Sequence, residues 1–222
     1  MMGKFWWGHK DNLSKTAWMS WKKMSLAKDE GGLGFCDLEL FNKALIAKQG
    51  WRILQHPESL AGKVLKEKYF QNSSFLESNL ERIPSYAWCN IWNGKSILME
   101  GMIWQVGDGK TIRIWEDRWI PSTSTNRIQS PNFSFPSNAW VDELIDYGKR
   151  WWNVQILQEL FSEEETGKLC SLAICLGRRS DQLVWGGTKN GVYSVRSGYH
   201  LAKESVQMDE ASCSSWQSNR EL

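Results

Sequence analysis

The chain has 222 residues, of which 41% are hydrophobic, and this composition is sufficient for one sizeable hydrophobic core or two small ones. Its 27 Lys and Arg residues and 25 Asp and Glu residues leave a formal net charge of +2, which is too small by itself to indicate a nucleic-acid partner. A run of about 18 apolar residues, as a bilayer span needs, is absent, and the N-terminus lacks the apolar stretch of a signal peptide, so we expect an intracellular protein, nuclear or cytoplasmic, with no membrane partner.

Cysteine and tryptophan contents add two constraints. The five cysteines are an odd number at irregular spacings, so we expect reduced thiols and no disulfide framework. The 15 tryptophans are spread along the chain, which favours their use as anchors of several small cores, with base stacking as the alternative.

The first hundred or so residues have the pattern of a small helical bundle. Residues 11–26 are predicted to form a helix, and Gly31, Gly32 and Gly34 then form a turn, in which glycine allows positive φ angles or close backbone approach. A helix from about residue 37 to residue 54 follows, with one narrow apolar stripe made by Leu40, Ala44, Ala47, Trp51 and Leu54. Residues 57–59 open another helix that ends near residue 69, and residues 86–100 are predicted to form a further one.

The period then changes to that of β-strands. Alternating residues around two glycine-containing turns predict two β-hairpins, at about residues 103–115 and at about residues 183–195. Short helices are expected between them at 141–147, 153–161 and 162–175, the last with Ser162 as its N-cap. The predicted fold class is therefore α+β, mainly helical with two β-hairpins.

Composition also suggests a domain organisation. Residues 1–120 are expected to form a helical region that includes the first hairpin, and residues 121–137 are rich in Ser, Thr, Asn and Pro, as in an exposed linker. Residues 138–204 are expected to form a small α+β region, and residues 205–222 a frayed tail.

An ordered series of motifs extends from about Lys4 to about Lys203. Its members are Phe5–Gly8, Trp18–Trp21, Glu30–Phe35, Phe41–Gln49, Lys63–Phe70, Val106–Gly109, Ile114–Pro121 and Gly191–Tyr199. In this order the series resembles the region that follows the polymerase core in plant LINE-type (non-LTR) retrotransposon reverse transcriptases, and an ordered set is far more specific than one short motif.

The resemblance implies a position between the polymerase palm and the zinc-binding and RNase H domains of that family, whose parent activity is RNA-directed DNA polymerisation. It implies a thumb-like and connection region, with residues 138–204 leading into a zinc-binding module whose Cys and His ligands come after the end of this chain. The chain is then expected to be the remnant of a reading frame that begins at an internal methionine.

Catalytic and metal-ligating patterns are missing from the sequence. The two adjacent aspartates of the family's polymerase signature do not occur, and solvated or capping roles are expected for the acidic pairs Asp29–Glu30, Glu116–Asp117, Asp142–Glu143 and Asp209–Glu210. Cys170 and Cys175 are the only close cysteine pair, and no histidine stands at zinc-finger spacing. We therefore expect no enzyme activity, no metal site and no cofactor.

Lysines interleaved with aromatic residues near the N-terminus are the remaining signal. Over residues 1–28, six lysines face one aspartate, a balance of +5, whereas over residues 137–166 seven acids face two basic residues, a balance of −5. The candidate nucleic-acid-binding residues are Lys4, Lys10, Lys15, Lys22 and Lys23, because phosphates attract cations and bases stack on flat side chains. The alternative is that Trp18 and Trp21 belong to a core and the lysines only solvate a helix.

The sequence thus predicts a non-catalytic fragment of a LINE-type reverse transcriptase with at most weak, sequence-independent binding of RNA or DNA. Two alternatives remain open: a domesticated protein interaction module that uses exposed tryptophans to bind an unknown protein partner, or a retroelement remnant without function.

Overall fold

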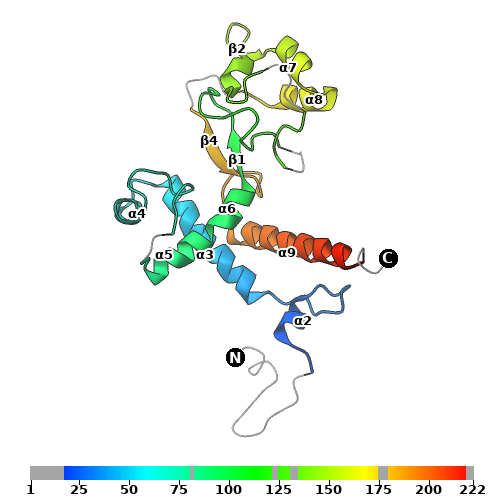
Figure 1. The fold of residues 1–222 in the computed structure, drawn as a ribbon. Helices are drawn as coiled ribbons and strands as arrows, with labels where there is room; N and C mark the ends of the chain where they lie inside the picture. Colours follow the sequence, from blue (N-terminus) through cyan, green and yellow to red (C-terminus); the bar gives the residue numbers. More distant parts are fainter. Residues whose placement is uncertain (1–17, 81–82, 122–124, 131–134, 175–179, 219–222) are drawn as a thin grey trace. The chain divides into compact units, whose positions relative to one another are not determined.

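The computed structural model describes residues 18–80, 83–121, 125–130, 135–174 and 180–218, with side chains up to residue 208 (Figure 1). The chain divides into two compact units: Met1–Ile97 with Gly198–Leu222, and Leu98–Ser197. The expected division at residues 121–137 differs from this one, because Ile128 and Phe135 pack with the core of the second unit instead of forming an exposed linker.

The first unit is helical. It contains α2 (Trp21–Ser25), α3 (Leu38–Gln55), α4 (Leu60–Tyr69) and α5 (Tyr86–Asn93), together with most of α9 (Val195–Ser218), and α6 (Lys95–Gly101) begins at its end. The predicted stripe of α3 is confirmed, since Leu40, Ala44, Ala47 and Trp51 are buried and Leu54 is half-buried. Regular α9 extends to Ser218, so residues 205–218 are helical where the sequence analysis expected a frayed tail, and residues 219–222 lie outside the described residues.

Side-chain caps begin the helices of this unit. The carboxylate of Asp37 accepts hydrogen bonds from the backbone N–H groups of Glu39 and Leu40 at the start of α3. The hydroxyls of Ser20, Ser59 and Ser85 accept equivalent bonds at the starts of α2, α4 and α5. Each cap satisfies a backbone donor that would otherwise lack a partner, so the chain can enter each helix at a defined residue.

Aromatic stacking joins α4 to α5. The Trp88 ring is fully buried and stacks on Tyr69, with parallel rings whose centroids are 4.5 Å apart. Phe70 and Phe75 pack around the same indole. The hydroxyl of Tyr69 also donates a 2.8 Å hydrogen bond to Oγ of Ser85, the cap of α5, so the same residues fix both the packing and the start of that helix.

A close backbone approach joins α3 to the end of α5. Ala47 is fully buried, and a Cβ atom added at Gly94 would lie 2.8 Å from the backbone nitrogen of Ala47. Small residues on both sides therefore allow α3 and α5 to pack against each other (Figure 1).

The second unit is an α+β assembly. Its elements are β1 (Met102–Gln105), the 3-10 helix η1 (Val141–Leu144), β2 (Ile145–Asp146), β3 (Trp151–Trp152), α7 (Val154–Leu160), α8 (Glu163–Ser171) and β4 (Gln182–Trp185). Its core contains Ile112, Ile114, Trp119, Ile120, Val141, Leu144, Trp152, Leu157 and Leu169, all nearly inaccessible to solvent. The predicted fold class is confirmed, since the structure is mainly helical with two small two-stranded antiparallel sheets.

The strands pair differently from the expected placement. β1 pairs with β4, with Met102 opposite Trp185 and Gln105 opposite Gln182, so residues 103–105 do not form a hairpin with residues 111–115. Arg113 instead forms an isolated bridge with Trp140, and residues 192–194 form no regular strand beside β4. The second sheet is the hairpin of β2 and β3, which the sequence pattern did not indicate. Local alternation identifies extended residues but carries no information on a partner so distant in sequence.

We expect Gly94→Ala to lower the free energy of unfolding by about 1–3 kcal/mol, because the new methyl group would collide with backbone atoms of Ala47, which cannot rotate away. Urea denaturation followed by circular dichroism measures the change. The matched control is Gly167→Ala in α8, where the added methyl group meets no atom within 4 Å. That variant should be as stable as the parent or more stable by up to about 1 kcal/mol; equal effects of both substitutions would contradict the proposed close approach.

Candidate functional site

The described part of the predicted lysine cluster lies on α2. Ser20 caps this short helix by accepting a 3.2 Å hydrogen bond from the backbone N–H of Lys23, and Met24 is fully buried beneath it. Lys22 and Lys23 are both exposed. The cap and the buried methionine thus place two adjacent cations at the surface of the first unit.

A glycine turn holds α2 in place. The carbonyl of Met24 accepts hydrogen bonds from the backbone N–H groups of Leu33 and Phe35, at 3.1 and 3.0 Å. Gly31 and Gly34 have φ angles of 77° and 71°, in the left-handed region that favours glycine. The predicted role of the glycines is confirmed, and they fold the chain back against the helix that carries the lysines.

Both aromatic residues beside these lysines have defined environments. Trp18 is 82% exposed, so it is not the core residue that the alternative interpretation required. Trp21 is half-buried, and its ring lies 5.7 Å from that of Phe35, so this indole packs partly against the glycine turn and is less accessible than that of Trp18. Among the predicted site residues the structure brings together Lys22 and Lys23; Lys4, Lys10 and Lys15 lie outside the described residues.

The acidic pairs mostly satisfy backbone donors. Glu30 accepts from the N–H of Ala27, Asp117 from that of Arg113, and Glu143 from that of Trp140, which confirms the expected capping roles. Asp142 is different: burial, followed by the nearby charge of Glu143, raises its pKa above the ordinary value. The side chains of Asp209 and Glu210 are outside the described part of the chain.

Metal ligands do not gather in the described residues. Within them, no group of three or more His, Cys, Asp or Glu side chains is arranged to hold a metal ion. Cys170 is half-buried against the core of the second unit, and Cys36, Cys89 and Cys170 are free thiols. Cys175 lies outside the described residues, and the predicted absence of a zinc site stays a prediction. None of the described helices is both long enough and apolar enough to cross a lipid bilayer.

A buried carboxylate that the sequence analysis missed organises the second unit. Asp181, which immediately precedes β4, accepts hydrogen bonds from the backbone N–H groups of Gly107, Gly109 and Thr111 at 2.7, 2.8 and 2.9 Å. The hydroxyl of Thr111 donates a fourth bond, at 2.8 Å. Burial alone would raise the pKa of Asp181, but these four bonds outweigh it and lower the pKa below its ordinary value.

No sequence pattern indicates this role, because the donors are 70 to 74 residues from the acceptor and are backbone groups. The only signal in the sequence is the glycine turn at residues 107–109, whose backbone N–H groups need a hydrogen-bond acceptor. Gly109 has a φ angle of 72°, and a Cβ atom there would lie 2.6 Å from the backbone nitrogen of Asp142. This turn is therefore fixed between Asp181 on one side and the start of η1 on the other.

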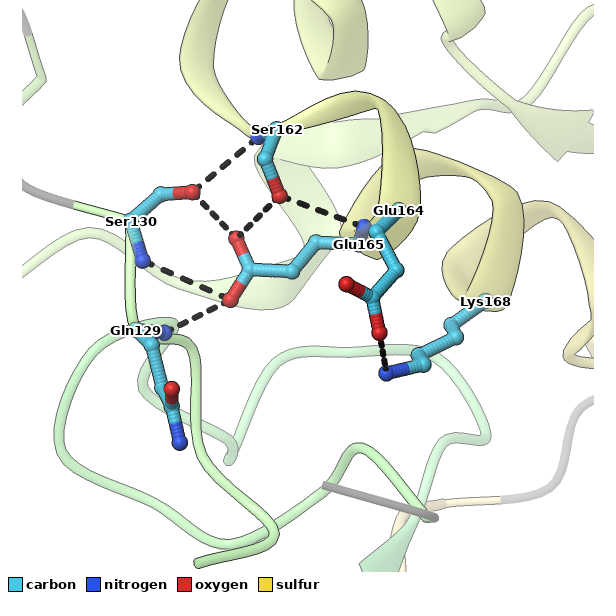
Figure 2. A network of polar contacts seen from close by, with 6 residues as sticks. All are labelled: Gln129, Ser130, Ser162, Glu164, Glu165 and Lys168. Atoms are coloured by element: carbon cyan, nitrogen blue, oxygen red, sulfur yellow. Dashed lines mark hydrogen bonds and ion pairs between the residues drawn. The ribbon is translucent and has the colours of Figure 1, made fainter. Parts of the chain in front are cut away.

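A second buried carboxylate belongs to the acidic first turn of α8. Figure 2 shows Glu165 turned inward, where it accepts hydrogen bonds from the backbone N–H of Gln129 at 2.7 Å and from the backbone and hydroxyl of Ser130. Ser162 caps the helix by accepting from the N–H of Glu165, as predicted, and Glu164 pairs with Lys168. Glu163 and Glu164 are exposed, whereas Glu165 is buried and binds the backbone of residues 129 and 130.

Comparison with known proteins identifies a relative in plants. Over 120 residues, 54% of this chain, the sequence is 43% identical to "Uncharacterized mitochondrial protein AtMg00310" of Arabidopsis thaliana, and the match covers 78% of that protein. The chain belongs to the same family as AtMg00310. No protein-family model matches this member of the AtMg00310 family, and no solved structure matches it.

A second relative is much longer. "Putative ribonuclease H protein At1g65750" of Arabidopsis thaliana is 29% identical over 204 residues, which are 89% of this chain but only 32% of that protein. This AtMg00310-family chain therefore spans about a third of the length of that relative.

We expect Asp181→Asn to lower the free energy of unfolding of this AtMg00310-family chain by about 3 kcal/mol, because an amide retains one acceptor oxygen, loses the charge and places an NH2 group against a backbone donor. Glu159→Gln on α7, an exposed site in the same unit, is the control and should change stability little.

The two variants should also differ in their response to acid. Because the folded-state pKa of Asp181 is lowered, its stabilisation is present above the unfolded-state value of about 4 and is lost as the pH falls through the folded-state pKa. Urea midpoints measured from neutral pH downwards should fall less steeply for Asp181→Asn than for the parent. Parallel curves would contradict the role assigned to Asp181.

Proposed function

We propose that this chain is a non-catalytic, retroelement-derived module that contacts nucleic acid through the lysines at and before α2, with little dependence on sequence. In this proposal it corresponds to the thumb-like and connection region of a LINE-type reverse transcriptase. The observation that carries the proposal is the exposure of Lys22, Lys23 and Trp18 in a stretch whose charge balance is +5.

Charge and geometry support this choice. Ser20 caps α2 and the glycine turn fastens it, so the backbone that carries Lys22 and Lys23 has a defined conformation at the surface. Two exposed cations supply attraction but no base-specific donor geometry, so affinity should be weak and strongly salt-dependent. The similarity to a protein named as a putative ribonuclease H supports a retroelement origin, and the order of the sequence motifs supports the particular region.

The absence of catalysis is part of the proposal. Phosphoryl transfer by polymerases and nucleases uses carboxylates that are free to bind metal ions about 4 Å apart. Glu30, Asp117 and Glu143 instead accept backbone hydrogen bonds, and Asp181 and Glu165 are buried in such bonds.

A protein interaction module is the second candidate. The 82% exposure of Trp18 favours it, because exposed tryptophans commonly anchor protein interfaces. Ionic strength separates the two candidates: phosphate contacts weaken steeply as salt rises, whereas an interface anchored on tryptophan does not.

We expect the triple variant Lys15→Ala, Lys22→Ala, Lys23→Ala to bind single-stranded and duplex oligonucleotides more weakly than the parent. Each lysine that contacts a phosphate contributes about 0.7–0.9 to the steepness of a plot of log K against log salt. If all three lysines make such contacts, their loss should flatten the slope by up to about three times that amount. Fluorescence anisotropy over a range of salt concentrations measures both quantities.

The control for this experiment has the same net charge. Lys43, Lys66 and Lys110 are exposed lysines elsewhere in the chain, and their joint replacement by alanine should leave the slope unchanged. Reversing the charge of Glu163 and Glu164 should do little or strengthen binding slightly; Glu165 is excluded because it is buried. Equal binding by the parent and the lysine variant at every salt concentration would refute the assigned site.

We expect the purified chain neither to extend a primer with nucleotides nor to cleave an RNA–DNA hybrid in the presence of magnesium. Gel assays of labelled substrates measure both reactions. Incorporation or cleavage that disappears when Asp142 or Glu143 is replaced by its amide would contradict the non-catalytic assignment.

A further inference from the structure

The second unit contains a cavity of about 450 Å³ along the β1–β4 ribbon. The strands contribute Ile103, Trp104 and Val184, and residues 186 and 188–191 of the turn that follows β4 form one end. Trp119 and Leu172 close the side that faces the core. The volume is within the range of about 300–1,000 Å³ that is usual for small-molecule sites.

Packing keeps the aromatic wall of the cavity in place. Trp185 is fully buried, its indole N–H donates a 2.8 Å hydrogen bond to Oγ of Ser197, and its ring meets Tyr193 edge to face at 4.5 Å. Trp104 lies two pairs further along the ribbon than the Met102–Trp185 pair, opposite Leu183, and remains half-buried. The cavity is thus preformed, with a partly accessible indole in its wall.

The polar end of the cavity is positive. Lys189 and Asn190 lie in the turn, and the lining includes no carboxylate. Within the described part of the chain, nothing accepts a hydrogen bond from the backbone N–H groups of residues 187–190, whereas those of Gly186 and Gly191 bond to Gly101 and Thr188. Successive backbone N–H groups that lack an acceptor in the protein, together with a neighbouring lysine, can bind an anion.

Glycine residues allow the turn at residues 186–191 to lie close to strands β1 and β4. A Cβ atom at Gly186 would lie 2.6 Å from Cδ1 of Ile103, and Gly191 has a φ angle of 69°. Side chains at these positions would move the turn away from the strands, so glycine brings the anion-binding groups next to the apolar wall.

We propose that this cavity binds one nucleotide of a single strand, with the base against Trp104, Ile103 and Val184 and the phosphate at Lys189 and the turn N–H groups. A flat apolar body joined to an anion matches both ends, whereas an apolar peptide side chain would leave the cationic end without a partner. This proposal deepens the proposed nucleic-acid function but uses residues far in sequence from the lysines of α2.

The test is an NMR titration of the full chain, labelled with 15N on its indole nitrogens, with uridine and adenosine monophosphate. The Trp104 signal is assigned from its loss in Trp104→Phe. Both nucleotides should shift this signal, and the nucleosides and inorganic phosphate should each bind at least about tenfold more weakly, because each fills only one end of the cavity. Lys189→Gln should weaken nucleotide binding about fivefold to tenfold, and Lys149→Gln, an exposed lysine outside the cavity, should not change it.

Three outcomes would overturn the proposal. They are a Trp104 signal that no nucleotide shifts, equal binding of nucleoside and nucleotide with no effect of Lys189→Gln, and equal binding of inorganic phosphate and nucleotide. The triple lysine variant separates this site from the one on α2, since it should bind mononucleotides like the parent. Loss of oligonucleotide binding in that variant, together with a Trp104 signal that no nucleotide moves, would refute the cavity and leave the α2 site standing.

Discussion

The carboxylate of Asp181 is the interaction on which the second unit depends. It joins the residue before β4 to the turn after β1, and the bonds from Gly107, Gly109 and Thr111 set the end of the ribbon at which Gln105 faces Gln182. Charged acceptors of several backbone donors are strong because the low dielectric of the interior removes competition from water. The register of the ribbon in turn places Trp185 in the core and Trp104 at the cavity.

In the first unit, helix caps rather than a buried carboxylate determine where the elements begin. Hydroxyl and carboxylate caps at Ser20, Asp37, Ser59 and Ser85 define where its helices begin, and the glycine turn folds the chain between the first two of them. In α2, Met24 is buried, and the preceding residues Lys22 and Lys23 are exposed. A capped and fastened helix loses little entropy when its lysines meet phosphates.

The sequence predicted local structure well and long-range structure poorly. The start and end of α3, the cap Ser162, and the positive φ angles of Gly31 and Gly34 follow from spacing and residue type, which act over a few residues. The pairing of β1 with β4 and the inward turn of Glu165 depend on partners that only the folded chain brings together. In the candidate site, the sequence analysis correctly predicted that Lys22 and Lys23 are exposed. It could not distinguish exposed Trp18 from half-buried Trp21, because both residues fit a short amphipathic helix.

The claim that α2 and its turn contact nucleic acid is tested most directly by amide hydrogen exchange of the full chain with and without a single-stranded RNA. The amides of Lys23, Met24, Leu33 and Phe35 donate the bonds that hold this region together, so contact there should slow their exchange. The account predicts slower exchange over residues 20–35 and unchanged exchange over α7 and α8, whose surface is acidic. Unchanged exchange over residues 20–35 at a saturating RNA concentration would contradict it.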